Sequence, residues 1–346
     1  MDLAPGTMVT SNVRLLRPLR EGGMGLVWIA EHLTLKTQVA VKFVSEDLLA
    51  AEPDLGTRFQ NEASLAAQIK SEHVVHTYDQ GVMEDGTPYI VMELLEGSTL
   101  TDWVELMGAL DLTSVVLLVT QLGKALQRAH RKGIIHRDIK SDNIFLVDTE
   151  ESEDVLFAKI LDFGIAKHTK LPELDMGTKP GTIVGTPEFM SPEQMLAEGP
   201  VDERSDLWAL AIVAYYALTG HVPFEGKTLV KLCLAVLDGS FPPPSTHVST
   251  IPPEVDRWFE EALAREPEDR FASVRDMAMA LQQAAGQRPQ SMSSGPGLAE
   301  PSHSGGWPAV DDEPSTPGAP EVSGAAVPLA RPELAPPGHK TFAGAS

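Results

Sequence analysis

The chain has 346 residues, of which 42% are hydrophobic and 22% are charged, a composition typical of soluble globular proteins. Its formal net charge of −22 disfavours nucleic acid and anionic membrane surfaces as partners, because contacts with phosphate groups require Lys and Arg. A single cysteine, Cys233, excludes an internal disulfide and fits a reducing compartment. The N-terminus lacks a signal sequence and no apolar run is long enough to span a bilayer, so we expect a cytoplasmic protein without a membrane span.

Residues 1–12 have the character of a short leader, and strand-like alternation begins at Val13. The glycine cluster Gly22-Gly23-Met24-Gly25 then separates this first strand from a second one at 26–30. A glycine-rich turn between strands lets backbone N–H groups approach an anion, although an ordinary hairpin turn has the same pattern. No Gly-Lys-Ser/Thr follows, so the cluster is not a Walker A loop.

A third strand is predicted over 38–44, where the period of two places Lys42 on one face with Ala40 and Val44. A lone lysine among small apolar neighbours is costly unless it meets an anion. That anion is a protein carboxylate, a ligand phosphate, or both. A helix predicted over 54–70 carries Glu62 at the edge of its apolar stripe, where the carboxylate either meets Lys42 or is solvated.

Two further strands are predicted around 74–78 and 89–95, and Glu96-Gly97-Ser98 then breaks the pattern. We place there the boundary between a small sheet-rich lobe, 13–95, and a helical lobe, 96–284.

The helical lobe holds one stretch in which charged residues lie between two apolar runs, 134–146. Its flanking Ile and Leu residues indicate buried strands, so the charged residues between them form a rigidly held loop. Asp138, Lys140 and Asn143 supply a carboxylate, an ammonium and an amide, which suit phosphate, a metal ion or a hydroxyl.

Other elements follow the same patterns. Residues 155–161 read as a strand that ends at the turn Asp162-Phe163-Gly164, and 167–191 read as a long functional loop. The tail, 287–346, is rich in Pro, Gly and Ser and is predicted to be disordered. Helices are predicted at 112–132, 207–218, 226–238, 253–264 and 273–285.

Six features occur in the order and spacing of one known family. They are the glycine loop, Val39-Ala40-Val41-Lys42, the helix with Glu62, His136-Arg137-Asp138-Ile139-Lys140-Ser141-Asp142-Asn143, Asp162-Phe163-Gly164, and Ser191-Pro192-Glu193. Over residues 13–284 the chain therefore resembles the eukaryotic-type (Hanks-type) protein kinases, and its motif sequences are most similar to those of the bacterial Ser/Thr branch. The resemblance implies an α+β, bilobal protein-kinase fold with a β-rich N-lobe, one large helix, and a mainly helical C-lobe.

The resemblance also implies roles for single residues. Lys42 holds the α- and β-phosphates and pairs with Glu62, Asp138 accepts the substrate hydroxyl proton, and Lys140 meets the γ-phosphate. Asn143 and Asp162 bind Mg²⁺, with Mn²⁺ as an alternative. The residues that the resemblance assigns to ATP binding are Leu19, Arg20, Glu21, Gly22, Gly23, Met24, Gly25, Leu26, Val27, Ala40, Lys42, Glu93 and Leu95.

Selectivity and regulation are implied in the same way. Lys140 together with Thr186 is similar to Ser/Thr rather than Tyr kinases, and Arg137 is the residue that receives a phosphorylated activation loop. The candidates for that phosphate are Thr169, Thr178 and Thr182, of which we favour Thr182. A buried pair between Glu193 and Arg270 and a bond from Asp206 to the catalytic-loop backbone are also implied.

Three residues depart from the family's usual glycine, proline and glycine: Arg20, Ser141 and Ala211. None removes a chemical group from the mechanism. The expected function is ATP-dependent phosphorylation of protein Ser/Thr hydroxyls, with autophosphorylation in the activation loop and a homodimer as one route to it. The alternative is a pseudokinase that binds nucleotide as a scaffold, and Arg20 is the one feature that favours it.

Overall fold

The structure is a computed structural model that describes residues 3–22, 25–51, 54–148, 156–162, 187–196 and 201–287. Within these ranges the side chains of Gly22, Glu46 and Glu62 lie outside the description. The described ranges belong to one compact unit of the chain.

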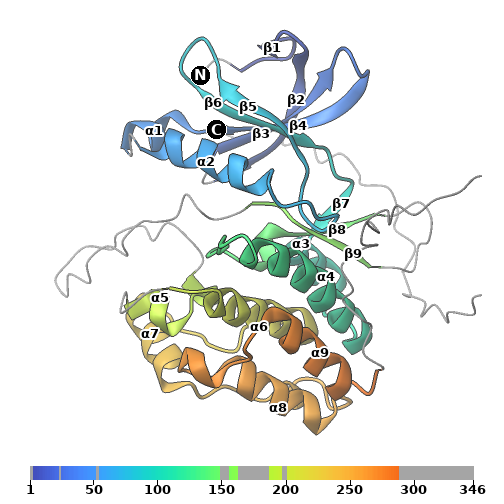
Figure 1. Cartoon of the computed structure of the whole chain (residues 1–346), viewed down its shortest axis with the longest axis vertical. Coiled ribbons are helices and arrows are strands. Elements are labelled where there is room, and N and C mark those ends of the chain that lie inside the picture. The colour runs from blue at the N-terminus through green and yellow to red at the C-terminus, as the bar shows by residue number, and fades with distance from the viewer. Residues whose placement is uncertain are drawn as a thin grey trace, which may run out of the picture. The chain divides into compact units, whose positions relative to one another are not determined.

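The N-terminal part is an antiparallel sheet of order β1-β2-β3-β4-β6-β5 (Figure 1). Helix α2 packs against β5 and β6 of this sheet. The elements are β1 Met8–Thr10, β2 Val13–Gly22, β3 Gly25–His32, β4 Thr37–Val44, α1 Glu46–Ala51, α2 Leu55–Ala66, β5 Thr77–Val82 and β6 Pro88–Glu93.

The two faces of β4 pack into different clusters, as the alternation of this strand predicts. Val39, Val41 and Phe43 lie in a cluster with residues of β2, β3 and β6. Val44, on the opposite face, packs with Phe59 of α2. Because Lys42 shares the face of Val44, it points toward α2 rather than into the larger cluster.

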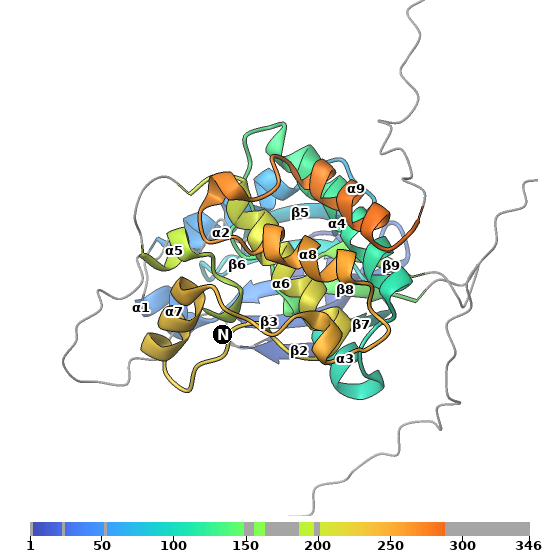
Figure 2. The same cartoon turned by 90° about the horizontal axis from the view of Figure 1, so that it is seen from below.

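The C-terminal part is helical, with a three-stranded sheet of order β7-β8-β9 (Figure 1). Helices α4, α6, α8 and α9 pack against one another (Figure 2). The elements are β7 Gly97–Thr99, α3 Leu100–Met107, α4 Leu112–His130, β8 Ile144–Val147, β9 Phe157–Ile160, α5 Pro192–Leu196, α6 Arg204–Thr219, α7 Leu229–Asp238, α8 Pro253–Ala262 and α9 Val274–Ala284. Short 3₁₀ turns occur at Ser141–Asn143, Pro187–Phe189, Pro244–Thr246 and Pro267–Asp269.

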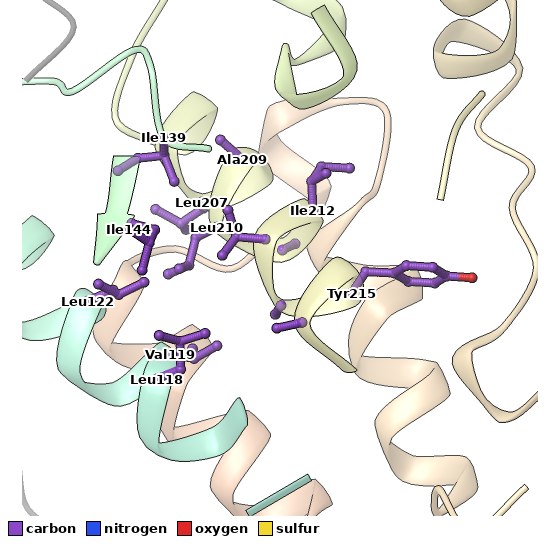
Figure 3. Packing of buried hydrophobic residues seen from close by; sticks show 14 of the residues in the cluster. Leu118, Val119, Leu122, Ile139, Ile144, Leu207, Ala209, Leu210, Ile212 and Tyr215 are labelled. Atoms are coloured by element: carbon purple, nitrogen blue, oxygen red, sulfur yellow. The ribbon is translucent and has the colours of Figure 1, made fainter. Parts of the chain in front are cut away.

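Helix α6 is buried on nearly all sides, as its uninterrupted apolar run predicts. Ile139, in the middle of the charged stretch, and Ile144, directly after it, pack near Leu207 and Leu210 of this helix (Figure 3). Ile134, in the apolar run before the charged residues, belongs to the same buried cluster. Apolar residues before, within and after the charged stretch therefore anchor the loop to the cluster around the most buried helix of the described chain.

Several predicted boundaries are wrong. Helix α2 ends at Ala66 rather than at 70, β6 ends at Glu93 rather than at 95, and α7 begins at Leu229 rather than at 226. The apolar run before the charged stretch, 134–135, is buried or partly buried without being a strand, so of the two flanks only β8 is one. Two further differences have a clear structural reason. Residues 74–76 are not a strand, because β5 begins at Thr77. Val74 and Val75 are buried all the same, since Val75 donates its N–H to the Ile160 carbonyl and Ile160 donates to that of His73. Residues 8–10, which the sequence places in the leader, form β1.

The described helices include none that is both long enough and apolar enough to cross a bilayer. The tail after residue 287 lies outside the description.

Candidate active site

The β2–β3 hairpin brings together the glycine cluster and the residues on either side of it. Arg20 pairs with Val27, Glu21 with Leu26 and Gly22 with Gly25. Gly25 has φ +145°, and a Cβ at this position would meet the Phe43 carbonyl oxygen at 1.9 Å. Only glycine fits there, so the residue type is required by the close approach of β4. Gly23 and Met24 lie outside the described residues.

Lys42 forms an ion pair with Asp162, with 2.8 Å between Nζ and Oδ2. The lysine side chain is only 14% exposed and its ammonium also lies 5.9 Å from the Phe59 ring centroid. The sequence predicted an anion for this lysine, and Asp162 is one. The predicted partner Glu62 lies in α2, but its side chain is among those not described.

Asp162 is ionised despite its environment. Burial favours the neutral acid, but the charge and hydrogen bond of Lys42, with the charge of Lys140, outweigh it and hold the pKa of Asp162 below its ordinary value. A carboxylate that stays charged beside a lysine is suited to a cation as well as to that lysine.

The end of β6 is braced by its own side chain. Glu93 donates its N–H to the His76 carbonyl at 2.9 Å, while its Oε1 accepts from the His76 N–H and from Lys159 Nζ, both at 2.6 Å. Lys159 and Glu93 are 13% and 20% exposed. These bonds fix the backbone and side chain of Glu93 at the end of β6. Leu95 lies two residues beyond β6, partly buried, and Ala40 is paired with Met92 in the neighbouring strand.

Asp138, Lys140 and Asn143 lie in the loop before β8 that the charged stretch predicted. Asn143 Nδ2 donates to the Asp138 carbonyl and to Asp138 Oδ2, each at 3.0 Å. Asn143 also donates its backbone N–H to the Lys140 carbonyl at 3.0 Å. The Asn143 side chain is thus tied to Asp138 and helps to orient its carboxylate, while the local turn joins the backbones of Asn143 and Lys140.

Asp206 of α6 holds the backbone of this loop by hydrogen bonds. Its fully buried carboxylate accepts the N–H groups of His136 and Arg137 at 2.8 Å each, which confirms the predicted bond to the loop backbone. It also lies 2.8 Å from His130 Nε2. The sequence reasoning missed His130, because a histidine in the last turn of an amphipathic helix carries no signal of a partner 76 residues away.

Arg137 has φ +66°, the left-handed region that a non-glycine residue adopts only when its surroundings enforce it. The next residue, Asp138, donates its N–H to His136 Nδ1 at 3.2 Å. Burial lowers the pKa of His136 although Asp206, Asp138 and Asp162 oppose that shift, so the imidazole is neutral and Nδ1 accepts. His136 therefore supports the loop backbone through this bond.

Two departures from the family pattern have structural partners. Ser141, in place of proline, accepts a 2.8 Å hydrogen bond from Thr101 and so joins the loop to α3. Arg20, in place of glycine, has Nη1 3.9 Å from Asp102 Oδ2, with both side chains more than half exposed. A solvated pair of this kind contributes little to stability.

Glu193 and Arg270 form the predicted pair, with two parallel bonds of 2.8 and 2.9 Å. The Arg270 side chain is fully buried and its guanidinium stacks over Trp208, 4.9 Å from the ring centroid. Burial opposes ionisation of Glu193, but the hydrogen bond and charge of Arg270 hold its pKa below the ordinary value.

The site offers oxygen ligands suited to a divalent cation. Leu161 donates its N–H to the Asn143 carbonyl at 2.9 Å, which places Asn143 beside Asp162. Since Asn143 Nδ2 is directed at Asp138, its Oδ1 is the atom left for a metal, next to the ionised Asp162. One carboxylate and one amide oxygen, completed by phosphate oxygens and water, would fit a hard divalent cation.

Several predicted residues lie outside the described ones. They are Phe163, Gly164, Thr169, Thr178, Thr182 and Thr186.

The chain belongs to the protein kinase domain family, whose sequence model matches residues 14–284. It is 41% identical over 271 residues to a serine/threonine-protein kinase, Pkn1, of Myxococcus xanthus, covering 78% of this chain. It is 36% identical over 270 residues to the serine/threonine-protein kinase PknH of Mycobacterium bovis, again covering 78% of this chain.

Solved structures agree on the fold. The PknI kinase domain of Mycobacterium tuberculosis has a TM-score of 0.63 at 27% identity, covering 82% of this chain and 100% of that one. Rad53 in complex with AMP-PNP has a TM-score of 0.60 at 25% identity, covering 76% of this chain and 62% of that one. The predicted α+β kinase fold is therefore confirmed.

The matched curated relatives are longer proteins. The chain spans 38% of the length of the Myxococcus relative and 43% of the Mycobacterium one.

Proposed function

We propose that the chain is an ATP-dependent serine/threonine protein kinase. The observation that carries the proposal is the constellation of Asp138 held by Asn143 beside Lys42 paired with Asp162. Both relatives named above are called serine/threonine-protein kinases, and Rad53 was solved with an ATP analogue.

In this proposal each residue has a distinct task. Asp138 orients the substrate hydroxyl and accepts its proton, and Asn143 keeps that carboxylate aimed. Lys42 and Lys140 neutralise phosphate charge. The ion pair between Asp162 and Lys42 fixes the positions of the two groups relative to each other, so that both act on one triphosphate.

A divalent cation, for which we propose Mg²⁺ rather than Mn²⁺, would be held by Asn143 Oδ1 and Asp162 and would offset the charge on the transferred phosphoryl group. The adenine would lie between Val27 and Ala40, with the Glu93 carbonyl and the Leu95 backbone at its edge. Leu19, Arg20, Glu21 and Leu26 of the hairpin would lie over the phosphates, together with the paired residues Gly22 and Gly25.

Regulation completes the proposal. A phosphate on the activation loop, which we place on Thr182 rather than Thr178, would pair with Arg137 and order the substrate loop around Thr186. We propose that this phosphate is transferred between two copies of the chain in a homodimer.

The test is incubation of the purified chain with labelled Mg-ATP and a generic protein substrate, followed by phosphoamino acid analysis. We expect phosphoserine and phosphothreonine on the substrate and, by mass spectrometry, phosphate between Lys167 and Thr186. Binding of ATP without any transfer would support the pseudokinase instead, and phosphotyrosine alone would contradict the Ser/Thr assignment.

A further inference from the structure

Gln194, in α5, has one side-chain amide that contacts two separate parts of the structure. Its Oε1 accepts the N–H of Ser191 at 3.1 Å and the Ser191 hydroxyl at 3.0 Å. Its Nε2 donates to the backbone carbonyl of Arg137 at 3.2 Å. A backbone N–H can only donate and a carbonyl can only accept, so these partners determine the orientation of the amide.

The first of these contacts is a helix cap. Ser191 precedes α5 with Pro192 at the first helical position, and Gln194 three residues on returns to the Ser191 N–H, which is the capping-box arrangement. Either Gln or Glu serves in such a box, because only an acceptor oxygen is needed. The cap therefore does not explain why the amide nitrogen is there.

The second contact falls on the peptide that joins Arg137 to Asp138. Gln194 binds the carbonyl of this peptide, and His136 Nδ1 binds its N–H. Asp206 holds the N–H on the other side of Arg137. The peptide is thus clamped at both of its polar atoms, directly before the Cα of Asp138.

This clamp bears on a strained residue. Arg137 has a left-handed φ of +66°, a conformation that costs a non-glycine residue about 1–3 kcal/mol. The residue would leave this conformation by rotation of the flanking peptides unless contacts around it prevent that rotation. Rotation of the peptide between Arg137 and Asp138 would break the Gln194 bond and turn the Asp138 side chain away from its bond with Asn143.

We infer that the Gln194 amide is a positioning group for catalysis: it locks the peptide before Asp138 and couples the start of α5, just after the activation segment, to the catalytic carboxylate. The effect on catalysis rests on the proposed phosphotransfer activity. The existence of the clamp does not depend on that activity.

Gln194→Glu separates the clamp from the cap, because glutamate keeps the acceptor for Ser191 and loses the donor to Arg137. We expect kcat for a peptide substrate to fall at least roughly tenfold, because loss of orientation near the reacting atoms has large kinetic cost. The dissociation constant for ATP should stay unchanged, whereas the melting temperature should fall, because a carboxylate oxygen then faces the Arg137 carbonyl oxygen. Gln194→Met, which loses cap and clamp without adding charge, should lower both kcat and the melting temperature. Ser191→Ala, which keeps the backbone cap and the clamp, should retain wild-type kcat.

Each result decides the inference. Wild-type kcat in Gln194→Glu with low kcat in Gln194→Met would reduce Gln194 to a helix cap. Low kcat in Gln194→Glu with wild-type kcat in Gln194→Met would assign the effect to the added charge. Either pattern overturns the clamp.

Hydrogen exchange of the Asp138 amide gives a readout that needs no turnover. Loss of the Gln194 bond weakens the hold on this peptide, whose N–H donates to His136 Nδ1, so the Asp138 amide should exchange faster in Gln194→Glu and Gln194→Met than in wild type. Equal exchange rates would overturn the clamp even in an active enzyme. If the wild-type chain transfers no phosphate, the proposed function fails while the exchange rates still decide whether the clamp exists.

Discussion

Arg270→Met tests how far the structure depends on one buried ion pair. The Arg270 side chain is fully buried and donates five hydrogen bonds, two to Glu193 and one each to the carbonyls of Ala264, Arg204 and Arg265. Methionine keeps most of the apolar stem, so the loss is chiefly polar. It leaves a carboxylate that is only 11% exposed without its partner.

Removing one member of a buried pair costs about 3–5 kcal/mol, because the remaining charge is desolvated without compensation. We expect a loss of that size in urea unfolding and a fall of roughly 10 °C in Tm. The double variant Arg270→Met with Glu193→Leu should lose less than the single variant, since it leaves no buried charge. The Trp208 ring, which stacks on Arg270, provides a local fluorescence signal.

The pH dependence gives a second check with a definite sign. In wild type the Glu193 pKa is held below its ordinary value. The ionised carboxylate therefore stabilises the fold at pH values above its pKa in the unfolded chain, and this stabilisation is lost as the pH falls through its pKa in the folded protein. In Arg270→Met the buried carboxylate should have a raised pKa, so protonation relieves its penalty. The difference in unfolding free energy between wild type and Arg270→Met should therefore become smaller as the pH falls from about 7 to about 5. An equal Tm for both proteins, or a difference independent of pH, would refute the reasoning.

Three further predictions concern the site. Lys42→Met removes the partner of Asp162 and should lower kcat roughly a hundredfold with a folded protein by circular dichroism; wild-type turnover would contradict this. Lys159→Met removes the ion pair with Glu93 and should raise KM for ATP by about threefold with little change in kcat. An unchanged KM would show that this ion pair does not contribute to ATP binding. Asp206→Asn sets an amide donor against a backbone N–H and should cost about 1–3 kcal/mol in urea unfolding, whereas unchanged stability would argue against its anchoring role.

Local patterns predicted most of the regular structure. The alternation of β4 predicted both faces of that strand, and the unbroken apolar run of α6 predicted its burial. The run Val74-Val75 was misread because burial against the backbone of β9 produces the same apolar signal as a strand. Hydrophobic periodicity predicts which residues are buried, but it predicts what they pack against only when the contacting residues are close in sequence.

The same limit explains the site. Motif order made Lys42 and Asp162 candidates for one site, and the structure brings the two side chains together although 120 residues separate them. His130, Lys159 and Gln194 were missed, because their partners lie far away in the chain and no motif names them. Lys159 had a usable signal, since it is a lone lysine within the strand Phe157–Ile160, as Lys42 is in β4.

The most direct measurement is phosphate transfer by Asp138→Asn, a variant that keeps the side-chain shape and removes the proton acceptor. Transfer to a protein substrate should fall by about a thousandfold, while the dissociation constant for ATP stays within about twofold of wild type. Gel-based transfer with labelled ATP and calorimetry of nucleotide binding measure the two quantities on the same preparation. Transfer at the wild-type rate in Asp138→Asn would contradict the central claim that this carboxylate carries the chemistry.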